Sequence, residues 1–401
     1  MLDRLQIRDI QKTHHETVLI MQGGGSLGAY ECGVYKTLEK HGIELDIVAG
    51  TSIGALNAAI IVGSKSNSPV QDLEHFWLTL AQNTVPSFLP DNIRSTYASM
   101  FAATYGNSNA FEPIWFSPCA VYNYPSFTSS SSSSSGYAIP HLYDIMPLKK
   151  TLSKFIDFDK INNYNKTTNG KGTDGRRTIT PRLIVTATDI QRSESVTFDS
   201  KYMKIDADHI VACAGFPFYG IAWTYKDGKY LWDGSLLSNT PLREVIDASP
   251  KYDKRVYIVN LFPRYQDDLP QNILDSWHRA RDIIHTDKTD HNIRMSKVIS
   301  RYLSLMRQMH DLLNNIQIEE DMRELYFEIE REYHKLAGDR GTIIDEITKI
   351  ERTEDIHFIF EDADFSIATI KNLIKQGEED AENAIAEKEK KKKTNKEEEG
   401  K

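Results

Sequence analysis

Short apolar runs separated by glycine-rich turns dominate the first part of the chain. Residues 17–21 (Thr-Val-Leu-Ile-Met) predict a buried strand, and residues 28–40 then place apolar side chains at helical spacing. A second apolar run at 47–49 ends at Gly50, and residues 53–62 are apolar on nearly every side, which indicates a helix inside a core. Two successive strand–turn–helix units predict an α/β fold with a mainly parallel sheet.

The same core pattern returns after a looser, more polar stretch. Residues 183–188, 196–198 and 256–261 predict three further strands. Two polar segments, at about 118–140 and 162–177, predict flexible inserts because such segments can bury little apolar surface.

The chain becomes charged and helical after about residue 268. Apolar side chains recur there every seven residues, at Met295, Tyr302, Met309 and Ile316. This spacing predicts a long amphipathic helix that docks on the core or pairs with Leu325–Leu336, and it leaves open a dimer seam or a membrane-surface helix. A later, shorter helix is expected at 367–374.

These patterns divide the chain into four parts. An N-terminal extension covers residues 1–15, an α/β domain residues 16–268, a mainly helical C-terminal region residues 269–377, and a charged tail residues 378–401. Runs of lysine and glutamate make us expect the tail to be disordered or a frayed helix. The C-terminal helices offer a route to an oligomer.

Composition narrows the class of protein. The 401 residues carry 48 basic and 57 acidic side chains, so the formal net charge is −9. This acidic balance argues against nucleic acid as the main partner, because such binding requires a basic surface, but it leaves a locally basic face open. There is no run of about 18 apolar residues, and residues 1–15 lack the apolar segment of a secretory signal. We therefore expect a cytoplasmic protein and leave peripheral membrane contact open.

The cysteines and histidines form no recognisable ligand set. Cys32, Cys119 and Cys213 follow neither a disulfide framework nor a zinc spacing, and we expect them to be buried thiols. None of the histidines in the α/β part lies in a motif; they include His14, His15, His41, His141 and His209. The sequence therefore predicts neither a metal nor a cofactor.

Residues 50–54 read Gly-Thr-Ser-Ile-Gly and lie between a predicted strand and a predicted helix. In that setting the G-x-S-x-G pattern marks a sharp turn that presents Ser52 at the start of the helix. Gly50 and Gly54 leave room for the strand and the helix to approach each other. Free N–H groups and the helix dipole favour negative charge developing there, so Ser52 is a candidate nucleophile.

A glycine-rich loop, Gln-Gly-Gly-Gly-Ser-Leu-Gly, precedes this turn at residues 22–28. Its backbone N–H groups can form an anion-binding nest that would serve as an oxyanion hole; the candidates are Gly23, Gly24, Gly25 and Ser26. The loop also fits the dinucleotide pattern G-x-G-x-x-G. That alternative needs an acidic residue at the end of the second strand, whereas Asp46 stands at its start.

Residues 232–235, Trp-Asp-Gly-Ser, form a third motif, although Asp233-Gly234 alone would indicate only a turn. The glycine loop, the serine turn, and Asp233-Gly234 with the following segment 236–242 together resemble the patatin-like phospholipase family over about residues 15–265. Residues 364–366 (Asp-Phe-Ser) look like the accessory C-terminal region of a bacterial-type subgroup of that family.

The resemblance implies a three-layer α/β/α fold, acyl-ester hydrolysis, and a dyad in which Ser52 is the nucleophile and Asp233 the general base. Two positions depart from the family pattern. Leu27 stands where many members carry Arg or Lys, and Ser235 replaces the Gly or Ala that usually follows Asp-Gly. The hydroxyl of Ser235 is an extra group that can hold Asp233.

A dyad of this kind poses a problem of basicity. An unperturbed aspartate has a pKa of about 3.9 and is a weak base at neutral pH. We therefore expect Asp233 to be desolvated by Trp232 and Tyr230, which would raise its pKa. A conventional triad would need a histidine. His209 is the best placed, because residues 209–217 resemble the family segment that lines the cleft.

These features predict a serine lipid acyl hydrolase that cleaves carboxylic esters of phospholipids or related lipids through an acyl-enzyme. Its expected partner is a lipid ester substrate. An acyltransferase would use the same acyl-enzyme with an alcohol or lysolipid as the acceptor. A third alternative is a non-catalytic lipid-binding or scaffold protein, against which the presence of both Ser52 and Asp233 argues.

Overall fold

A computed structural model describes residues 15–82, 85–86, 90–114, 141–164, 180–316, 318–340, 342–353 and 360–399. Within them one sheet runs in the order β10-β9-β1-β2-β5-β8-β7, with β6 beside β5. Its strands are β1 (His15–Met21), β2 (Ile47–Thr51), β5 (Arg182–Asp189), β6 (Glu194–Asp199), β7 (Thr224–Lys226), β8 (Lys229–Asp233), β9 (Asp253–Asn260) and β10 (Ile344–Glu351). A separate short pair joins β3 (Glu112–Pro113) to β4 (Tyr143–Asp144).

The centre of the sheet is parallel and its far side is antiparallel. Strands β10, β9, β1, β2 and β5 are parallel neighbours. Strands β6 and β8 run antiparallel to β5, and β7 runs antiparallel to β8. The strands predicted near 17–21, 47–49, 183–188, 196–198 and 256–261 are confirmed, as is the α/β fold class.

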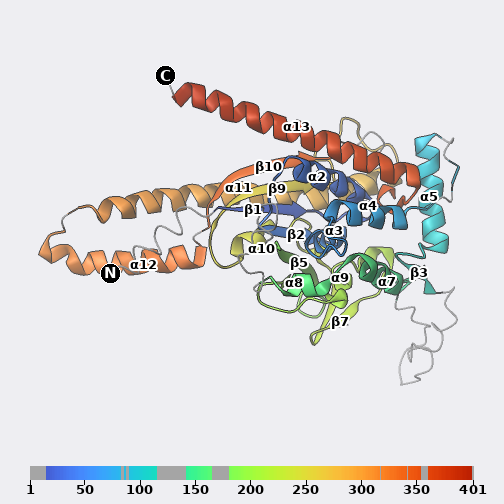
Figure 1. Cartoon of the computed structure of the whole chain (residues 1–401), viewed down its shortest axis with the longest axis horizontal. Coiled ribbons are helices and arrows are strands. Elements are labelled where there is room, and N and C mark those ends of the chain that lie inside the picture. Colours follow the sequence, from blue (N-terminus) through green and yellow to red (C-terminus); the bar gives the residue numbers. More distant parts are fainter. Residues whose placement is uncertain are drawn as a thin grey trace.

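Helices cover both faces of the sheet (Figure 1). They are α2 (Ala29–Lys40), α3 (Ile53–Val62), α4 (Pro69–Leu80), α5 (Asp91–Tyr105), α7 (Met146–Phe155), α8 (Phe158–Asn162), α9 (Ala207–Ala212), α10 (Leu242–Asp247), α11 (Ile273–Leu313), α12 (Arg323–Arg340) and α13 (Ile367–Glu399). Single 3₁₀ turns lie at η1 (Gly25–Gly28), η4 (Pro217–Tyr219), η5 (Gly234–Leu236), η6 (Glu320–Met322) and η7 (Glu361–Ala363).

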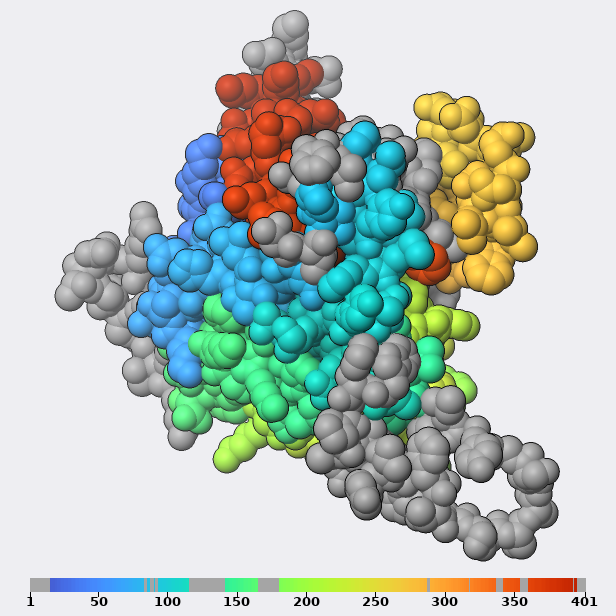
Figure 2. All heavy atoms as spheres, turned by 90° about the vertical axis from the view of Figure 1, so that its right-hand side faces the viewer, coloured from blue at the N-terminus to red at the C-terminus, as the bar shows by residue number. Residues whose placement is uncertain are grey.

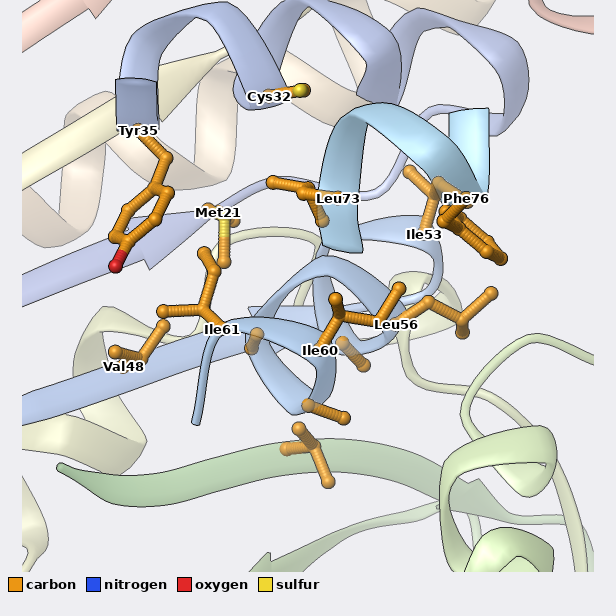
Figure 3. Packing of buried hydrophobic residues seen from close by; sticks show 14 of the residues in the cluster. Met21, Cys32, Tyr35, Val48, Ile53, Leu56, Ile60, Ile61, Leu73 and Phe76 are labelled. Carbon is orange, nitrogen blue, oxygen red and sulfur yellow. The ribbon is translucent and has the colours of Figure 1, made fainter. Parts of the chain in front are cut away.

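Side chains of alternate residues in the central strands pack into two separate hydrophobic cores, one on each face of the sheet. Leu19 and Met21 of β1 belong to the larger core, with α2, α3 and α4, whereas Val18 and Ile20 face a second core formed with α10 and Ile293 of α11. Helix α3 is buried along its whole length in the larger core. Figure 3 shows Ile53, Leu56 and Ile60 of this helix among side chains of its neighbours. The central sheet is therefore covered by helices on both faces.

Within the described residues the C-terminal part is mainly helical, and it also joins the α/β core. Strand β10 adds an edge strand to the main sheet beside β9, and α13 lies along α2. For the tail from 378 onward the disordered alternative is wrong, because the helix α13 continues to Glu399. Ala381 and Ile385 are buried in the larger core, and this packing stabilises a helix whose remaining surface is charged.

Helices α2 and α13 touch backbone to backbone. A Cβ atom on Gly33 of α2 would lie 1.9 Å from the carbonyl oxygen of Ile374, and one on Gly377 of α13 would lie 2.0 Å from that of Tyr30. Each helix therefore contributes one glycine to the contact. A side chain at either position would push the two helices apart.

The amphipathic helix predicted around Met295–Ile316 is confirmed as the second half of α11, but its seven-residue stripe does not dock on the core. Met295, Tyr302 and Met309 are exposed, while smaller or polar side chains such as Ser296 and Ser300 face the sheet. Near its end α11 pairs with α12 around a shallow apolar groove, as the second alternative predicted; the groove is lined by Met306, Met309, Leu313, Leu325, Ile329 and Leu336. Oligomer formation through these helices stays a prediction.

Several predictions from the sequence lie outside the described residues. They concern Cys119, the first insert at 118–140, most of the second insert, and residues 1–14 of the N-terminal extension. Cys32 and Cys213 are buried and free, as expected. None of the described helices is both long enough and apolar enough to cross a membrane.

The close contact between α2 and α13 predicts a specific loss of stability. Replacing Gly33 with Val should destabilise the protein by about 1–3 kcal/mol or more, because the added carbons collide with the backbone of α13. Thermal unfolding measures the loss, and faster proteolysis within 367–399 would report release of α13. Gly42→Asn is the control, since that position faces open space and Asn tolerates its positive φ. Equal stability of Gly33→Val and wild type would contradict the contact.

Candidate active site

Ser52 occupies the turn between β2 and α3. Its φ angle is +55°, in the left-handed region that residues with side chains rarely adopt. The turn is tight because a Cβ atom on Gly50 would lie 2.1 Å from the carbonyl oxygen of Gly54, and one on Gly54 would lie 2.5 Å from that of Met21. The strand–turn–helix setting predicted for the motif is therefore confirmed.

Asp233 approaches Ser52 from another strand. It ends β8, where it pairs with Ala187 of β5. The Ser52 hydroxyl donates to Asp233 Oδ2 at 2.6 Å, although 181 residues separate the two in the chain. The other carboxylate oxygen, Oδ1, accepts the backbone N–H of Ser235 at 2.8 Å. The carboxylate is thus held at one oxygen by the backbone and faces the serine with the other.

Asp233 is completely buried, and this burial raises its pKa to about 6, while its hydrogen-bond donors act to lower the pKa. The direction expected from the sequence is confirmed. The expected cause is wrong, because side chains alternate along β8 and Trp232 and Tyr230 face away from Asp233. One group on the aspartate's side is the buried Cys213, whose thiol pKa is raised by burial and then by the charge of Asp233.

The glycine loop lies against Ser52, since a Cβ atom on Gly23 would be 2.8 Å from Ser52 Cβ. The N–H of Gly23 donates to Asn239 Oδ1 at 3.1 Å, and Asn239 Nδ2 donates back to the Gly23 carbonyl at 3.2 Å. Gly23 is therefore not available as an oxyanion donor, contrary to expectation. The sequence motif contained Asn239 but offered no signal of this clamp.

Three N–H groups of the loop remain as candidates. Within the described part of the chain, the backbone N–H groups of Gly24, Gly25 and Ser26 meet no acceptor. Leu27, which replaces a basic residue of many family members, is buried in the larger core. A short nest of free donors therefore lies beside the serine, with no cation at the Leu27 position.

A segment from the far end of the chain packs onto this loop. The Ser26 hydroxyl donates to the carbonyl oxygen of Glu361 at 3.0 Å, and a Cβ atom on Gly25 would lie 2.2 Å from that of Asp362. On its other side the segment meets α5, where the Ser99 hydroxyl donates to the Phe360 carbonyl at 2.8 Å. Turn η7 thus wedges between the loop and α5, a contact that the sequence analysis missed.

Arg281 of α11 holds η7 in place. Its guanidinium donates to Glu361 Oε1 at 3.0 Å and lies 3.4 Å from Asp362 Oδ1. Arg352 also donates to Glu361 Oε1 at 3.0 Å, and the Tyr219 hydroxyl bonds to Asp362. Burial raises the pKa of Asp362, and the charge of Arg281 opposes that rise. This buried cluster anchors the acidic turn beside the glycine loop.

An apolar cavity of about 350 Å³ has Ser52 and Gly25 in its wall. Most of its lining is aliphatic or aromatic, including Leu56, Leu80, Phe111, Ile145, Leu148 and Phe365. One lining residue, Asp362, carries a charge, and Arg281 balances it. Size and lining are those of a site for an apolar small molecule.

Other candidate residues lie outside this group. His209 is buried with its Nδ1 facing Asp206 and its Nε2 2.9 Å from Asp227, so it does not complete a triad. Asp46 accepts the N–H of Thr17 near the start of β1, at the opposite end of that strand from the glycine loop. The dinucleotide alternative therefore lacks its acidic residue.

Three side chains of the types that bind metal ions lie together on the hairpin formed by α11 and α12. The sequence analysis did not predict this cluster. His310, Glu330 and His334 bring one potential ligand atom each within 4.8 Å of one another. None of the three lines the cavity at Ser52. The cluster therefore plays no part in the chemistry of the candidate site.

Comparisons with known proteins agree with the geometry. The sequence profile described as "Patatin-like phospholipase" matches residues 19–246. Patatin-like phospholipase domain-containing protein 7 of Rattus norvegicus is 31% identical over 97 residues, which cover 24% of this chain and 7% of that protein. Triacylglycerol lipase SDP1L of Arabidopsis thaliana is 36% identical over 75 residues, covering 18% of this chain and 9% of the relative.

These alignments span less than a tenth of the relatives' own lengths. The crystal structure of VipD from Legionella pneumophila aligns with 93% of this chain and 67% of that one, at 15% identity and a TM-score of 0.38. Nothing is inferred from a TM-score this low. Assignment to a bacterial-type subgroup stays a prediction. The matched profile covers more than half of the chain and includes the glycine loop, Ser52 and Asp233, so this chain belongs to the patatin-like phospholipase family.

Proposed function

We propose that this protein hydrolyses carboxylic esters of phospholipids or related lipids, with Ser52 as the nucleophile and Asp233 as the general base. The observation that carries the proposal is the 2.6 Å hydrogen bond between Ser52 Oγ and Asp233 Oδ2. Ser52 lines an apolar cavity, so an acyl group attached to it would have apolar surface beside it. Membership of the family supports ester hydrolysis as the reaction class.

In the first half of the reaction, Ser52 Oγ attacks the ester carbonyl carbon while its proton passes to Asp233 Oδ2. The carbonyl oxygen becomes an oxyanion, and the free N–H groups of Gly24, Gly25 and Ser26 are its proposed hydrogen-bond donors. Donors of this kind lower the barrier by about 3–4 kcal/mol each in other hydrolases. The tetrahedral species then collapses, and the leaving alcohol takes the proton from Asp233.

In the second half, water attacks the acyl-enzyme. Asp233 Oδ2 accepts one proton from the water, and the resulting hydroxide forms a bond to the acyl carbon. Collapse releases the fatty acid and returns the proton to Ser52 Oγ. An aspartate with a pKa near 6 is ionised at neutral pH and remains basic enough to accept these protons.

Substitution of either dyad residue should abolish turnover. We expect Ser52→Ala and Asp233→Asn to lower p-nitrophenyl ester hydrolysis by about a thousandfold or more, since each removes one side of the proton transfer. A fluorophosphonate probe should label wild type and not Ser52→Ala. Asp227→Asn is the matched control, because it removes a partner of His209 without touching the dyad, and it should retain activity.

The same assay separates the alternatives. A wild-type protein that neither labels nor hydrolyses esters, with detergent or vesicles present, would contradict the proposal and favour a non-catalytic lipid-binding protein. Transfer of the acyl group to an added lysolipid in preference to water would identify an acyltransferase. Loss of activity in Asp227→Asn would indicate that His209 takes part in the reaction.

The raised pKa of Asp233 predicts the pH dependence of the reaction. The base works only when it is ionised, so kcat/KM should rise with pH, with a midpoint near 6, and level off above it. A pH–rate profile on a neutral soluble ester measures this midpoint. A midpoint near 4, the value of an ordinary aspartate, would contradict the buried base.

Asp233→Asn should also make the protein more stable at alkaline pH. Moving the pKa from 3.8 to about 6 corresponds to about 3 kcal/mol, and the native state loses this stability as the pH rises through 6 because it must then bury the charge. Thermal unfolding at pH 8 should therefore favour Asp233→Asn over wild type, and the difference should vanish near pH 4. A less stable Asp233→Asn at pH 8 would contradict this account.

A further inference from the structure

Helix α5 exposes several large apolar side chains on its outer face, whereas a helix that packs only on its own protein normally buries such side chains. Ile93, Tyr97 and Met100 are 42%, 59% and 59% exposed, and their spacing of four and three residues places them on one stripe. The buried face of the same helix carries small residues, Ala98 and Ala102. A surface helix normally has the reverse arrangement, so this exposed stripe is suited to contact another apolar surface.

The stripe continues into the rim of the cavity at Ser52. Met100 lines that cavity, and so do three apolar side chains from other segments: Leu142, Phe218 and Phe360. All three are exposed, and Phe218, the middle residue of η4, is 81% exposed. Single exposed apolar side chains are normal, but a set of exposed apolar side chains that together line one apolar cavity marks a site of interaction. Figure 2 faces this side of the molecule, with α5 in cyan at the surface.

Helix α5 and the described lining of the cavity carry few charged residues. From Asp91 to Tyr105 the helix has two charged residues, Asp91 and Arg94, and the Arg94 side chain is buried. Among the residues that line the cavity, Asp362 alone is charged, and it is buried against Arg281. The opposite character is found at the end of α13, where Lys390, Lys391 and Lys393 follow one another closely. Among the described residues that line the cavity, therefore, no basic side chain is present to bind an anionic partner.

We propose that α5 and the apolar rim of the cavity form the face that rests on a neutral lipid surface. This inference rests on the proposed function, in which the cavity receives an acyl chain. With the rim seated in the headgroup region, an acyl chain passes from the lipid layer into the cavity without crossing water. The contact is made by inserted apolar side chains rather than by charge.

The exposed apolar residues of the α11–α12 hairpin are the natural comparison. Tyr302 and Leu305 are as exposed as the α5 stripe, but they do not line the cavity. A lipid surface bound there would gain nothing from the position of Ser52. Substitutions on the two helices therefore test whether exposure alone or continuity with the cavity decides binding.

The test is flotation of the full chain with vesicles of zwitterionic phosphatidylcholine, in a Ser52→Ala background that leaves the lipid intact. Ile93→Gln/Tyr97→Gln should lower vesicle affinity by about tenfold or more, whereas the control Tyr302→Gln/Leu305→Gln should bind like the parent. Binding should be the same at about 0.1 M and about 1 M NaCl, because screening affects only charged contacts. With Ser52 restored, Ile93→Gln/Tyr97→Gln should hydrolyse a soluble ester normally, since neither residue lines the cavity.

Four results would overturn the proposal. The first two are unchanged flotation of Ile93→Gln/Tyr97→Gln and failure of the parent to float. The third is release of the protein at high salt, which would point to the lysines of α13. The fourth is a dimer, seen in sedimentation velocity, that Ile93→Gln/Tyr97→Gln alone dissociates; it would identify a second copy of the chain as the occupant. The proposed function fails separately. If wild type hydrolyses no ester while flotation still depends on α5, the lipid-binding face stands without the hydrolase.

Discussion

The contact between the backbones of Gly50 and Gly54 constrains everything else at the candidate site. Because strand β2 and helix α3 touch where a side chain would collide, the chain must reverse at a single residue, Ser52. A residue held at a positive φ costs about 1–3 kcal/mol, so the surroundings must hold it there. They do so through Thr51, whose hydroxyl lies 2.7 Å from that of Thr186, and through α3, which is buried along its whole length.

Burial decides both the chemistry and the stability of this region. The base that faces Ser52 is useful because no water surrounds it, and for the same reason its charged form is costly to the fold. The negative charge that the reaction would develop lies beside a loop in which the N–H groups of Gly24, Gly25 and Ser26 meet no acceptor among the described residues. Three successive N–H groups without an acceptor in the described part of the chain thus lie beside the serine, which is typical of a functional site rather than of a structural core.

Most of the correct predictions of strands and site residues came from patterns in short stretches of the sequence. Strands buried on both faces are continuous apolar runs, and the serine turn and Asp233 lie in short motifs. Contacts between distant segments have no such signal: Asn239 clamps Gly23 across 216 residues, and nothing local to either residue announces it. The tail was misjudged for another reason. Gly377, Ala381 and Ile385 recur every four residues, a helical spacing that the surrounding Lys and Glu runs obscured.

The positions of the cavity-lining residues along the sequence also set the order in which the parts of the cavity are synthesised. Its wall includes Asp362 and Phe365, and Glu361 reaches back to Ser26 across 335 residues. Because the ribosome makes proteins from the N-terminus, both members of the dyad emerge long before this wall exists. A nascent chain therefore holds an unfinished pocket with its glycine loop uncovered, and β9 has one free edge until β10 arrives. Completion of the site and completion of the sheet are one late event in biosynthesis.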